Sequence, residues 1–209
     1  MTTPHMTAPT LEIESFLWQK GYRYIVGIDE VGRGSWAGPL VAAGVILPRN
    51  FQIPDGLADS KQVKPRTRSM LAKLITEKAI ATYFAQISST QIDKYGITKA
   101  TANAFRKIAR KLIPMPDFCL IDAFHIKYFA QKKQMAITGG DKICASIAAA
   151  SIIAKVYRDN LMKKISYRYP QYGFAKHKGY GTKSHQQAIK KYGLLSIHRK
   201  SYNLGFLFQ

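Results

Sequence analysis

The sequence has 209 residues, of which 46% are hydrophobic, so the chain can bury a substantial core and is not a disordered basic tail. Lysine and arginine number 32 against 12 aspartate and glutamate, which gives a net charge of +20 at pH 7. This charge favours a polyanionic partner, nucleic acid before an anionic membrane surface. No run of about 18 apolar residues is present, so we expect no membrane partner.

The chain start and the cysteines indicate the compartment. The first ten residues, MTTPHMTAPT, have neither a basic flank nor an apolar segment, so we expect no secretory signal. Cys119 and Cys144 lie among apolar residues, which is typical of buried thiols in a reducing environment. We therefore expect a cytoplasmic protein.

The hydrophobic pattern predicts an α/β protein. In chain order, the expected elements are strand 22–28, strand 40–47, helix 66–77, strand 79–88, helix 97–113, strand 117–121, strand 134–138, helix 142–168 and helix 182–191. The alanines and serines of helix 142–168 would let it pack closely on the sheet. No repeat, low-complexity linker or domain break interrupts the pattern, so we expect one domain over 1–209, with an N-terminal extension over about 1–20.

Four acids stand at the ends of these strands or at a helix start. Asp29 and Glu30 follow YIVGI, Asp122 follows DFCLI, and Asp141 follows MAITGG. Loops at strand ends are where α/β sheets collect ligands. Neighbouring strand residues point to opposite faces, so Asp29 and Glu30 can reach one site only where the strand ends or bulges. The adjoining glycines allow such a change.

Acids in so basic a chain indicate metal-dependent chemistry on a polyanion. Carboxylates alone repel phosphate, whereas carboxylates that hold Mg²⁺ attract it, because Mg²⁺ takes oxygen ligands and binds substrate phosphates. Two such ions can activate a water and stabilise the leaving oxygen of a phosphodiester. His177 and His185 fall in a basic loop, and no Cys/His spacing suggests zinc. The pattern therefore favours a metal-dependent nuclease.

Each acid also has a simpler interpretation. The pair Asp29-Glu30 fits a solvated strand end, Asp122 fits a turn, and Asp141 fits the N-cap of a helix beginning near Lys142. Asp159 lies inside a predicted helix, and we expect it to be a structural charge rather than a ligand. The four acids together are harder to dismiss than any one alone.

The opening motif GIDEVGRGSWAGPLVAAGVIL closely resembles that of the ribonuclease HII family. The resemblance continues in order through ADSKQV, LIDAF, GGDKICASIAAASIIAKVYRD, YPQYGFAKHKGYGTKSH and HRKS, from Tyr24 to Ser201. It implies an α/β fold with an RNase H-like mixed five-stranded sheet flanked by helices and a C-terminal helical extension. The sister family ribonuclease HIII typically has a separate N-terminal domain and a lysine in this motif, so Arg33 and the short N-terminal segment favour HII.

The resemblance also implies a reaction. It assigns the catalytic and metal-binding roles to Asp29, Glu30, Asp122 and Asp141, with two divalent ions, either Mg²⁺ or Mn²⁺. The implied activity is hydrolysis of the phosphodiester 5′ of a ribonucleotide, in RNA–DNA hybrids and at single ribonucleotides embedded in duplex DNA. The products are a 3′-hydroxyl and a 5′-phosphate, and the implied roles are ribonucleotide removal from DNA and primer removal.

Substrate contacts are implied in the same way. Gly32, Arg33 and Gly34 would read the ribose 2′-hydroxyl largely through backbone groups, and Tyr180 would stack on the sugar. That hydroxyl alone separates ribose from deoxyribose. We expect further phosphate contacts from Lys61, His177, Lys178 and Lys183. The region from about 170 to 209 would thus contact substrate. The competing interpretation is that residues 32–34 form an ordinary glycine turn, that Tyr180 is a structural aromatic, and that the lysines are solvated.

Two alternative functions and one further partner stay open. A DNA-cutting integrase or resolvase would share the acids but not the Gly-Arg-Gly, and a non-catalytic RNA- or DNA-binding module would explain the charge but not the acids. The tail NLGFLFQ either docks on a replication sliding clamp or packs on its own domain, through Leu204, Phe206, Leu207 and Phe208. We expect a monomer.

Overall fold

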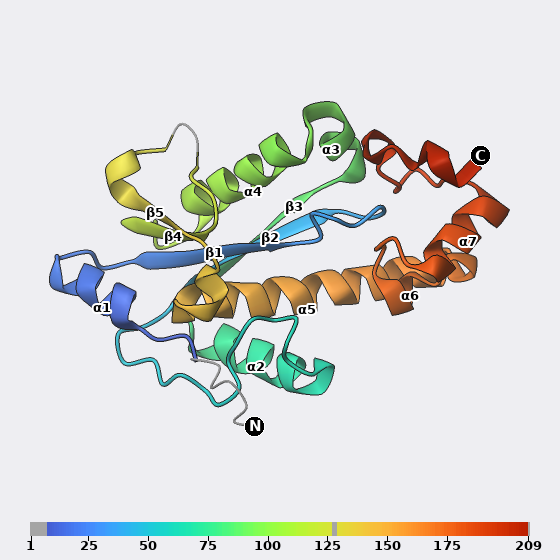
Figure 1. The fold of residues 1–209 in the computed structure, drawn as a ribbon. Coiled ribbons are helices and arrows are strands. Elements are labelled where there is room, and N and C mark those ends of the chain that lie inside the picture. The colour runs from blue at the N-terminus through green and yellow to red at the C-terminus, as the bar shows by residue number, and fades with distance from the viewer. Residues whose placement is uncertain (1–7, 127–128, 209) are drawn as a thin grey trace, which may run out of the picture.

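The structure, a computed structural model, describes residues 8–126 and 129–208 (Figure 1). Its five strands form one sheet in the order β3-β2-β1-β4-β5. The strands are β1 (Ile25–Val31), β2 (Leu40–Ile46), β3 (Ala81–Ile87), β4 (Phe118–Asp122) and β5 (Gln134–Ile137). β1, β2 and β3 pair antiparallel, whereas β4 runs parallel to β1 and β5 parallel to β4. The predicted mixed five-stranded sheet is therefore confirmed.

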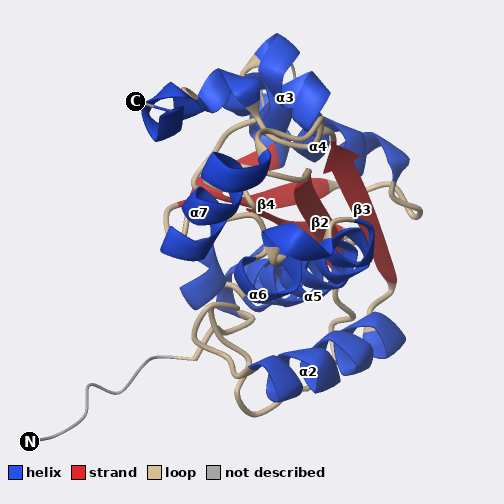
Figure 2. Ribbon diagram, turned by 90° about the vertical axis from the view of Figure 1, so that its right-hand side faces the viewer, coloured by secondary structure: helices blue, strands red, loops and turns tan. Residues whose placement is uncertain are grey.

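Helices cover both faces of the sheet, as Figures 1 and 2 show. The α-helices are α1 (Glu12–Gln19), α2 (Pro65–Lys78), α3 (Ser89–Tyr95), α4 (Ile97–Lys111), α5 (Ala145–Arg168), α6 (Phe174–His177) and α7 (Lys183–Tyr192). Short 3₁₀ helices lie at Gln131–Lys133, Gly140–Lys142, Pro170–Tyr172, Lys200–Tyr202 and Leu204–Phe208. None of the helices that the structure describes has an apolar stretch long enough to cross a membrane.

The alternation of side chains along β2 shows how the two core layers form. Leu40, Ala42 and Ile46 pack in the cluster that includes α4, while Ala43 and Val45 pack in the cluster that includes α2 and α5. Strand side chains alternate between faces with a period of two, so one apolar strand supplies both layers. The sheet is buried on both sides, which fixes the positions of its strand ends.

Helix α5 lies unusually close to β1. A Cβ atom at Gly27 would stand 2.2 Å from the carbonyl carbon of Ser146, so only glycine fits there. The first turns of α5 bury Ala145, Ala148 and Ala149, whose small side chains permit this approach, as the sequence predicted. The N-terminal helix α1 packs Leu17 and Trp18 in a further buried cluster, which includes Ile25 of β1 and residues of β4.

Two predicted boundaries were wrong in ways that affect the site. The first strand begins at Ile25 and continues to Val31, so it includes Asp29 and Glu30 instead of ending before them. The long helix begins at Ala145, after a separate 3₁₀ turn that contains Asp141. The N-cap of α5 is Cys144 and makes no side-chain cap bond, so the N-cap interpretation of Asp141 was wrong.

The C-terminal segment packs beyond the end of α5, beside α6 and α7 (Figure 1). Leu204 and Leu207 are buried in a cluster with Ala37 and Met162, so these two residues pack on their own domain. Phe206 is half exposed, with its ring near that of Trp36. The side chain at position 208 lies outside the described residues.

Candidate active site

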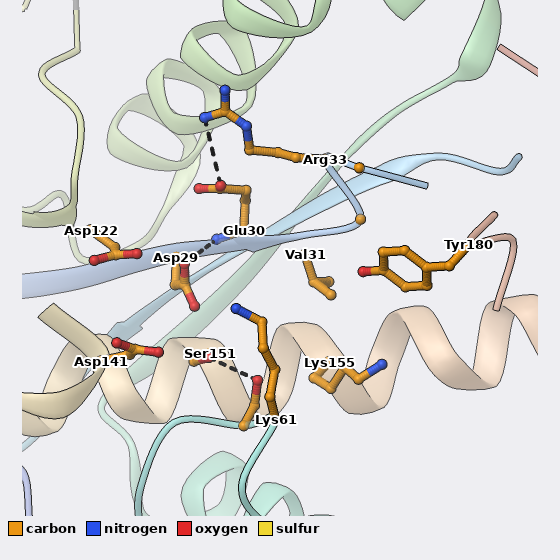
Figure 3. A pocket seen from close by; sticks show the side chains of 13 residues that line it. Asp29, Glu30, Val31, Arg33, Lys61, Asp122, Asp141, Ser151, Lys155 and Tyr180 are labelled. Carbon is orange, nitrogen blue, oxygen red and sulfur yellow. Dashed lines mark hydrogen bonds and ion pairs between the residues drawn. The ribbon is translucent and has the colours of Figure 1, made fainter. Parts of the chain in front are cut away.

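A cavity of about 450 Å³ opens where β1 and β4 end (Figure 3). Its lining residues are Asp29, Glu30, Val31, Gly32, Arg33, Gly34, Ser60, Lys61, Asp122, Asp141, Ser151, Lys155 and Tyr180. The fold therefore brings together all four predicted acids, the Gly-Arg-Gly segment and two of the predicted substrate contacts, from segments far apart in the sequence.

Asp29 and Glu30 reach this cavity although they lie inside a strand. Asp29 pairs with Ala43 and Glu30 with Ala42, residues that face opposite core layers. The pairing of β1 with β4 stops at Ile28, whereas β1 stays paired with β2 through Val31. The edge beside Asp29 and Glu30 is thus uncovered. In Figure 3, Asp29 extends toward Asp141 and Glu30 toward Arg33.

Asp122 and Asp141 come from the neighbouring strand ends. Asp122 is the last residue of β4, and its Oδ1 accepts a hydrogen bond from the N–H of Gly140 at 2.8 Å. Asp141 lies in the 3₁₀ turn that follows β5, preceded by Gly139 in the left-handed conformation. The parallel pairing of β1, β4 and β5 is therefore what places the four acids at one edge of the sheet.

The site concentrates negative charge in a buried place. Burial raises the pKa of Asp29 well above its usual range, and the charges of Glu30 and Asp122 raise it further. Burial, with a contribution from Asp122, raises the pKa of Glu30 to about 7, although Arg33 and Lys61 oppose that rise. Burial and the charges of Asp59 and Asp122 raise the pKa of Asp141 to about 6. Burial and the mutual repulsion of the acids therefore outweigh the nearby positive charges of Arg33 and Lys61.

The carboxylates fit divalent metal ions. Burial and repulsion disfavour the ionised form of these carboxylates. A bound cation would stabilise that form, because its positive charge offsets the negative charges of the acids. The Oε2 atom of Glu30 is buried and has no hydrogen-bond partner, which leaves a ligand atom available. Within the described ranges, no three His, Cys, Asp or Glu side chains already converge closely enough to hold an ion. An ion bound by three or more of them would therefore have to draw these side chains together.

The Gly-Arg-Gly segment presents backbone donors to the cavity. The carbonyl of Gly32 accepts from the Ser35 hydroxyl at 2.9 Å, and that of Arg33 accepts from Arg199 at 2.7 Å and from the hydroxyl of Tyr202. In the part of the chain that the structure describes, the N–H groups of Arg33 and Gly34 donate to no protein acceptor. These N–H groups, together with that of Gly32, are left for a ligand.

The Arg33 side chain turns away from this segment. Its guanidinium stacks over the ring of Phe124 at 4.4 Å and lies 3.9 Å from Oε1 of Glu30. The guanidinium therefore contacts protein groups on one side of the cavity, while the backbone of residue 33 lies in the Gly-Arg-Gly segment. This arrangement agrees with the backbone role that the resemblance implies.

The residues on either side of Tyr180 pack against Trp36 and Ala37, which follow the Gly-Arg-Gly segment. The carbonyl of Gly179 accepts hydrogen bonds from the N–H groups of Trp36 and Ala37, at 2.8 and 3.2 Å. A Cβ at Gly181 would lie 2.3 Å from the Trp36 ring, so the two segments are in close contact. Tyr180 lines the cavity in Figure 3, on the side opposite Asp122.

Three predicted phosphate contacts lie outside the cavity lining. Lys178 has a left-handed backbone, and its amine donates to the carbonyl of Ala175. Lys183 is exposed at the first position of α7. His177 is buried in α6, where Nδ1 accepts from the N–H of Gly179 and Nε2 donates to a backbone carbonyl. The prediction that His177 and His185 lie in a loop was wrong, because His177 is in α6 and His185 is buried in α7. Both ring nitrogens of His177 are occupied by backbone groups.

His177 belongs to a cluster of three buried histidines whose tautomers the hydrogen bonds fix. His198 Nδ1 accepts from the N–H of Leu195 at 2.8 Å, so its proton is on Nε2. That proton is donated to Nε2 of His185 at 3.1 Å, and His185 Nδ1 donates to the carbonyl of Tyr180 at 3.0 Å. The His177 ring stacks on that of His185 at 4.4 Å. Every ring nitrogen is satisfied when all three histidines are neutral.

Several lining residues were missed by the sequence analysis. Ser151 and Lys155 are four residues apart on α5, and Ser60 precedes the predicted Lys61. The Ser151 hydroxyl donates to that of Ser60 at 3.0 Å and lowers the pKa of Asp29. In the sequence, the only indication of these residues is that Ser151 and Lys155 are spaced to share one helix face. That spacing does not show whether the face points toward the cavity.

Asp159 is a structural charge, as expected. It accepts from Lys155 at 2.7 Å and lies 3.6 Å from the guanidinium of Arg68. These contacts join α5 to α2. Asp159 is not among the residues that line the cavity.

Solved structures show which fold class this is. The chain superposes on the PCNA:RNase HII complex from Archaeoglobus fulgidus with a TM-score of 0.74 at 24% identity, covering 88% of this chain and 97% of that one. A Bst-RNase HIII structure in complex with Mn²⁺ gives a TM-score of 0.62 at 21% identity, covering 81% and 63%. These likenesses show that the chain has the fold of these ribonuclease structures.

The sequence comparisons then identify the family. The model of the Ribonuclease HII family matches residues 26–204. A ribonuclease HII of Chloroherpeton thalassium is 46% identical over 198 residues, which cover 93% of this chain and 96% of that protein. The chain belongs to the ribonuclease HII family, the type 2 RNase H endonucleases. Neither the integrase nor the non-catalytic binding module fits this membership.

Proposed function

We propose that this protein hydrolyses the phosphodiester on the 5′ side of a ribonucleotide, in RNA–DNA hybrids and at single ribonucleotides embedded in duplex DNA. It leaves a 3′-hydroxyl and a 5′-phosphate. One observation carries the proposal: a single cavity joins four carboxylates to the free N–H groups of the Gly-Arg-Gly segment. Groups suited to cut a phosphodiester and groups suited to recognise a ribose thus face the same space.

Asp29, Glu30, Asp122 and Asp141 are the residues that would hold two divalent ions. Their oxygen-only donor set suits Mg²⁺ or Mn²⁺, and the related Bst-RNase HIII was solved with Mn²⁺. Bound ions of this kind activate a water and stabilise the leaving oxygen. The free Oε2 of Glu30 and the raised pKa of Glu30 and Asp141 support this assignment.

The ribose would be recognised by the N–H groups of Arg33 and Gly34. A 2′-hydroxyl can accept from these donors, whereas a deoxyribose leaves them desolvated and unpaired. The carbonyls of Gly32 and Arg33 are already occupied, which supports recognition through donors rather than these acceptors. Tyr180 would stack on the sugar from its side of the cavity.

The basic residues would hold the phosphates. Lys61 lines the cavity and faces Glu30 and Asp141, so it suits the phosphate near the cleaved bond. Lys178 and Lys183 belong to the C-terminal region of about 170–209, and we propose that they contact phosphates outside the cavity. His177 is left out of this set because its ring nitrogens are occupied.

The decisive experiment maps cleavage on three duplexes with Mg²⁺. They are DNA with one ribonucleotide, the same DNA with the matching deoxyribonucleotide, and DNA with four consecutive ribonucleotides. We expect one cut immediately 5′ of the single ribonucleotide and none in the deoxy duplex. Equal cutting of the deoxy duplex would remove the ribose-recognition role of residues 32–34.

The wider role follows from the substrate. We propose that the enzyme removes ribonucleotides and RNA primers from DNA in the cytoplasm, where the buried free thiols of Cys119 and Cys144 stay reduced. The four carboxylates and the Gly-Arg-Gly segment already meet in one cavity without a second subunit, so we propose a monomer. A sliding-clamp contact through the tail, suggested by the PCNA complex of the Archaeoglobus protein, would require Leu204 and Leu207 to leave their cluster. We favour the packed tail.

A further inference from the structure

Arg158 is completely buried in α5, where no carboxylate of the described residues forms an ion pair with it. Its guanidinium instead donates four hydrogen bonds to neutral oxygens. Nε donates to the Pro39 carbonyl at 3.0 Å and Nη1 to the Lys178 carbonyl at 3.0 Å. Nη2 donates to the Ser35 hydroxyl at 2.7 Å and to the Ala37 carbonyl at 3.3 Å.

These acceptors lie on the two segments that carry the proposed ribose contacts. Ser35 follows the Gly-Arg-Gly directly, and its hydroxyl donates onward to the Gly32 carbonyl. Lys178 is two residues before Tyr180, whose ring lies 5.5 Å from the guanidinium carbon of Arg158. A Cβ at Gly32 would stand 2.2 Å from Nε of Arg158. One side chain therefore touches both segments and sets the distance between them.

A purely structural role explains these contacts less well. A buried cation without an ionic partner is costly to retain, and apolar residues of similar volume commonly stabilise such sites better. Burial lowers the pKa of Arg158 to about 10, so it stays charged at neutral pH despite this cost. Only a planar fork of five donors can reach four acceptors in fixed directions, and lysine cannot reproduce it.

We propose that Arg158 is a positioning residue for ribose recognition, which holds the Gly-Arg-Gly segment and Tyr180 in one register so that both meet the same nucleotide. The inference rests on the proposed function. A misplacement of about 1 Å can reduce a rate about 100-fold. A single embedded ribonucleotide depends on this register most, because a hybrid offers several ribonucleotides in a row.

The test compares Arg158→Lys with the wild type on a single-ribonucleotide duplex and on an RNA–DNA hybrid. We expect kcat/KM on the single-ribonucleotide duplex to fall about 10- to 100-fold more than on the hybrid. Ser35→Ala removes the bridge to Gly32 with little change in volume, and it should shift the same ratio in the same direction. This second variant keeps the test valid should Arg158→Lys fold poorly.

Arg68→Lys is the matched control, because Arg68 is also a buried arginine but is not among the cavity-lining residues, and it contacts Val63 and Asp159 instead of the two recognition segments. It should lower stability without changing the substrate ratio. In a Tyr180→Ala background, Arg158→Lys should have a smaller effect, since the two act together. An unchanged ratio in both Arg158→Lys and Ser35→Ala would overturn the proposal. Failure of the proposed function itself would show separately, as deoxy cutting by the wild type.

Discussion

Gly32 and Gly34 are two residues apart, and the protein fold itself requires glycine only at the first of them. Gly32 has a φ of +91°, and a side chain there would meet Arg158. A Cβ at Gly34 would meet no protein atom within 4 Å, and its backbone is not left-handed. The protein fold thus requires Gly32, whereas the empty space at Gly34 is the space that a nucleotide would fill.

Alanine at each position should separate these two causes. Gly34→Ala should leave stability within about 0.5 kcal/mol of the wild type and yet reduce cleavage at least about tenfold, because the methyl group projects into the cavity. Gly32→Ala should lose about 1–3 kcal/mol through backbone strain. Urea unfolding and steady-state cleavage measure the two effects. Full activity of Gly34→Ala would contradict close approach of the substrate at this residue.

Asp29 should lower the stability of the metal-free protein and yet be required for cleavage. Burial and neighbouring acids raise its pKa, so its charged form is unfavourable in the metal-free protein. Asp29→Asn keeps an oxygen for the N–H of Glu30 and removes the charge. Cleavage should disappear, duplex binding should persist, and the metal-free Tm should rise, by about 2–4 °C for each kcal/mol gained.

Asp93→Asn is the opposite control. Hydrogen bonds from Ser201 and Lys200 lower the pKa of Asp93, so its charged form is favourable. Its amide variant should lower the Tm and leave cleavage intact. A metal-free Tm of Asp29→Asn below that of the wild type, together with normal turnover, would remove Asp29 from the metal site.

At the scale of elements, α6 and α7 are joined through three neutral histidines. Burial lowers the pKa of His185 and of His198 to about 4, and it also lowers that of His177. Unfolded histidines take up protons near pH 6.5. Between pH 6.5 and 4 the unfolded chain therefore binds more protons than the folded chain, so stability falls as the pH falls. The stability that the neutral histidines contribute is fully present above about pH 6.5.

His198→Asn should weaken this dependence. The variant offers an oxygen to the N–H of Leu195 but cannot be protonated, so the slope of unfolding free energy against pH should fall by up to about 1.4 kcal/mol per pH unit. The buried acids, with their raised pKa, act in the opposite sense, and the difference between variant and wild type cancels them. His125→Asn, at an exposed residue, is the control. Equal slopes for wild type and His198→Asn would contradict the assignment of His198 as a neutral histidine in the folded protein.

The elements also show how far sequence reasoning reaches. Strand apolarity and the amphipathic α4 predicted the sheet and its flanking helices, because each pattern is local. The acids were predicted because four carboxylates in a basic chain are conspicuous. Arg158 was missed because its partners lie up to 123 residues away and all but one of them are backbone carbonyls, which leave no trace in side-chain identity. The burial of His177 was missed because a histidine among lysines suggests a surface.

For the whole molecule, charge separates into two regions. The acids that line the cavity come from the first 141 residues, and no acid follows Asp159, a stretch that carries ten of the 32 basic residues. The duplex would thus meet an acidic centre beside a wholly basic C-terminal region. Neutralised phosphates release counterions, which makes such binding depend on salt.

Duplex affinity should therefore fall steeply with salt. The slope of log K against log salt should be about −0.9 for each phosphate contacted on B-form DNA. Lys183→Gln should make that slope shallower by about one contact. Lys73→Gln removes an exposed charge on α2 and should leave the slope unchanged. Binding by fluorescence anisotropy from about 50 to 200 mM salt measures this, and a flat response would assign the charge to another purpose.

The bond between Arg199 and the Arg33 carbonyl joins residues 166 positions apart. Chains are synthesised from the N-terminus at about 5–20 residues per second. The Arg33 carbonyl therefore lacks its Arg199 hydrogen bond until residue 199 has been made. A growing chain that already has its first acids and its Gly-Arg-Gly therefore lacks the support that shapes them into a recognition loop. The recognition loop thus gains this support only after residue 199 has been synthesised and has folded back onto residue 33.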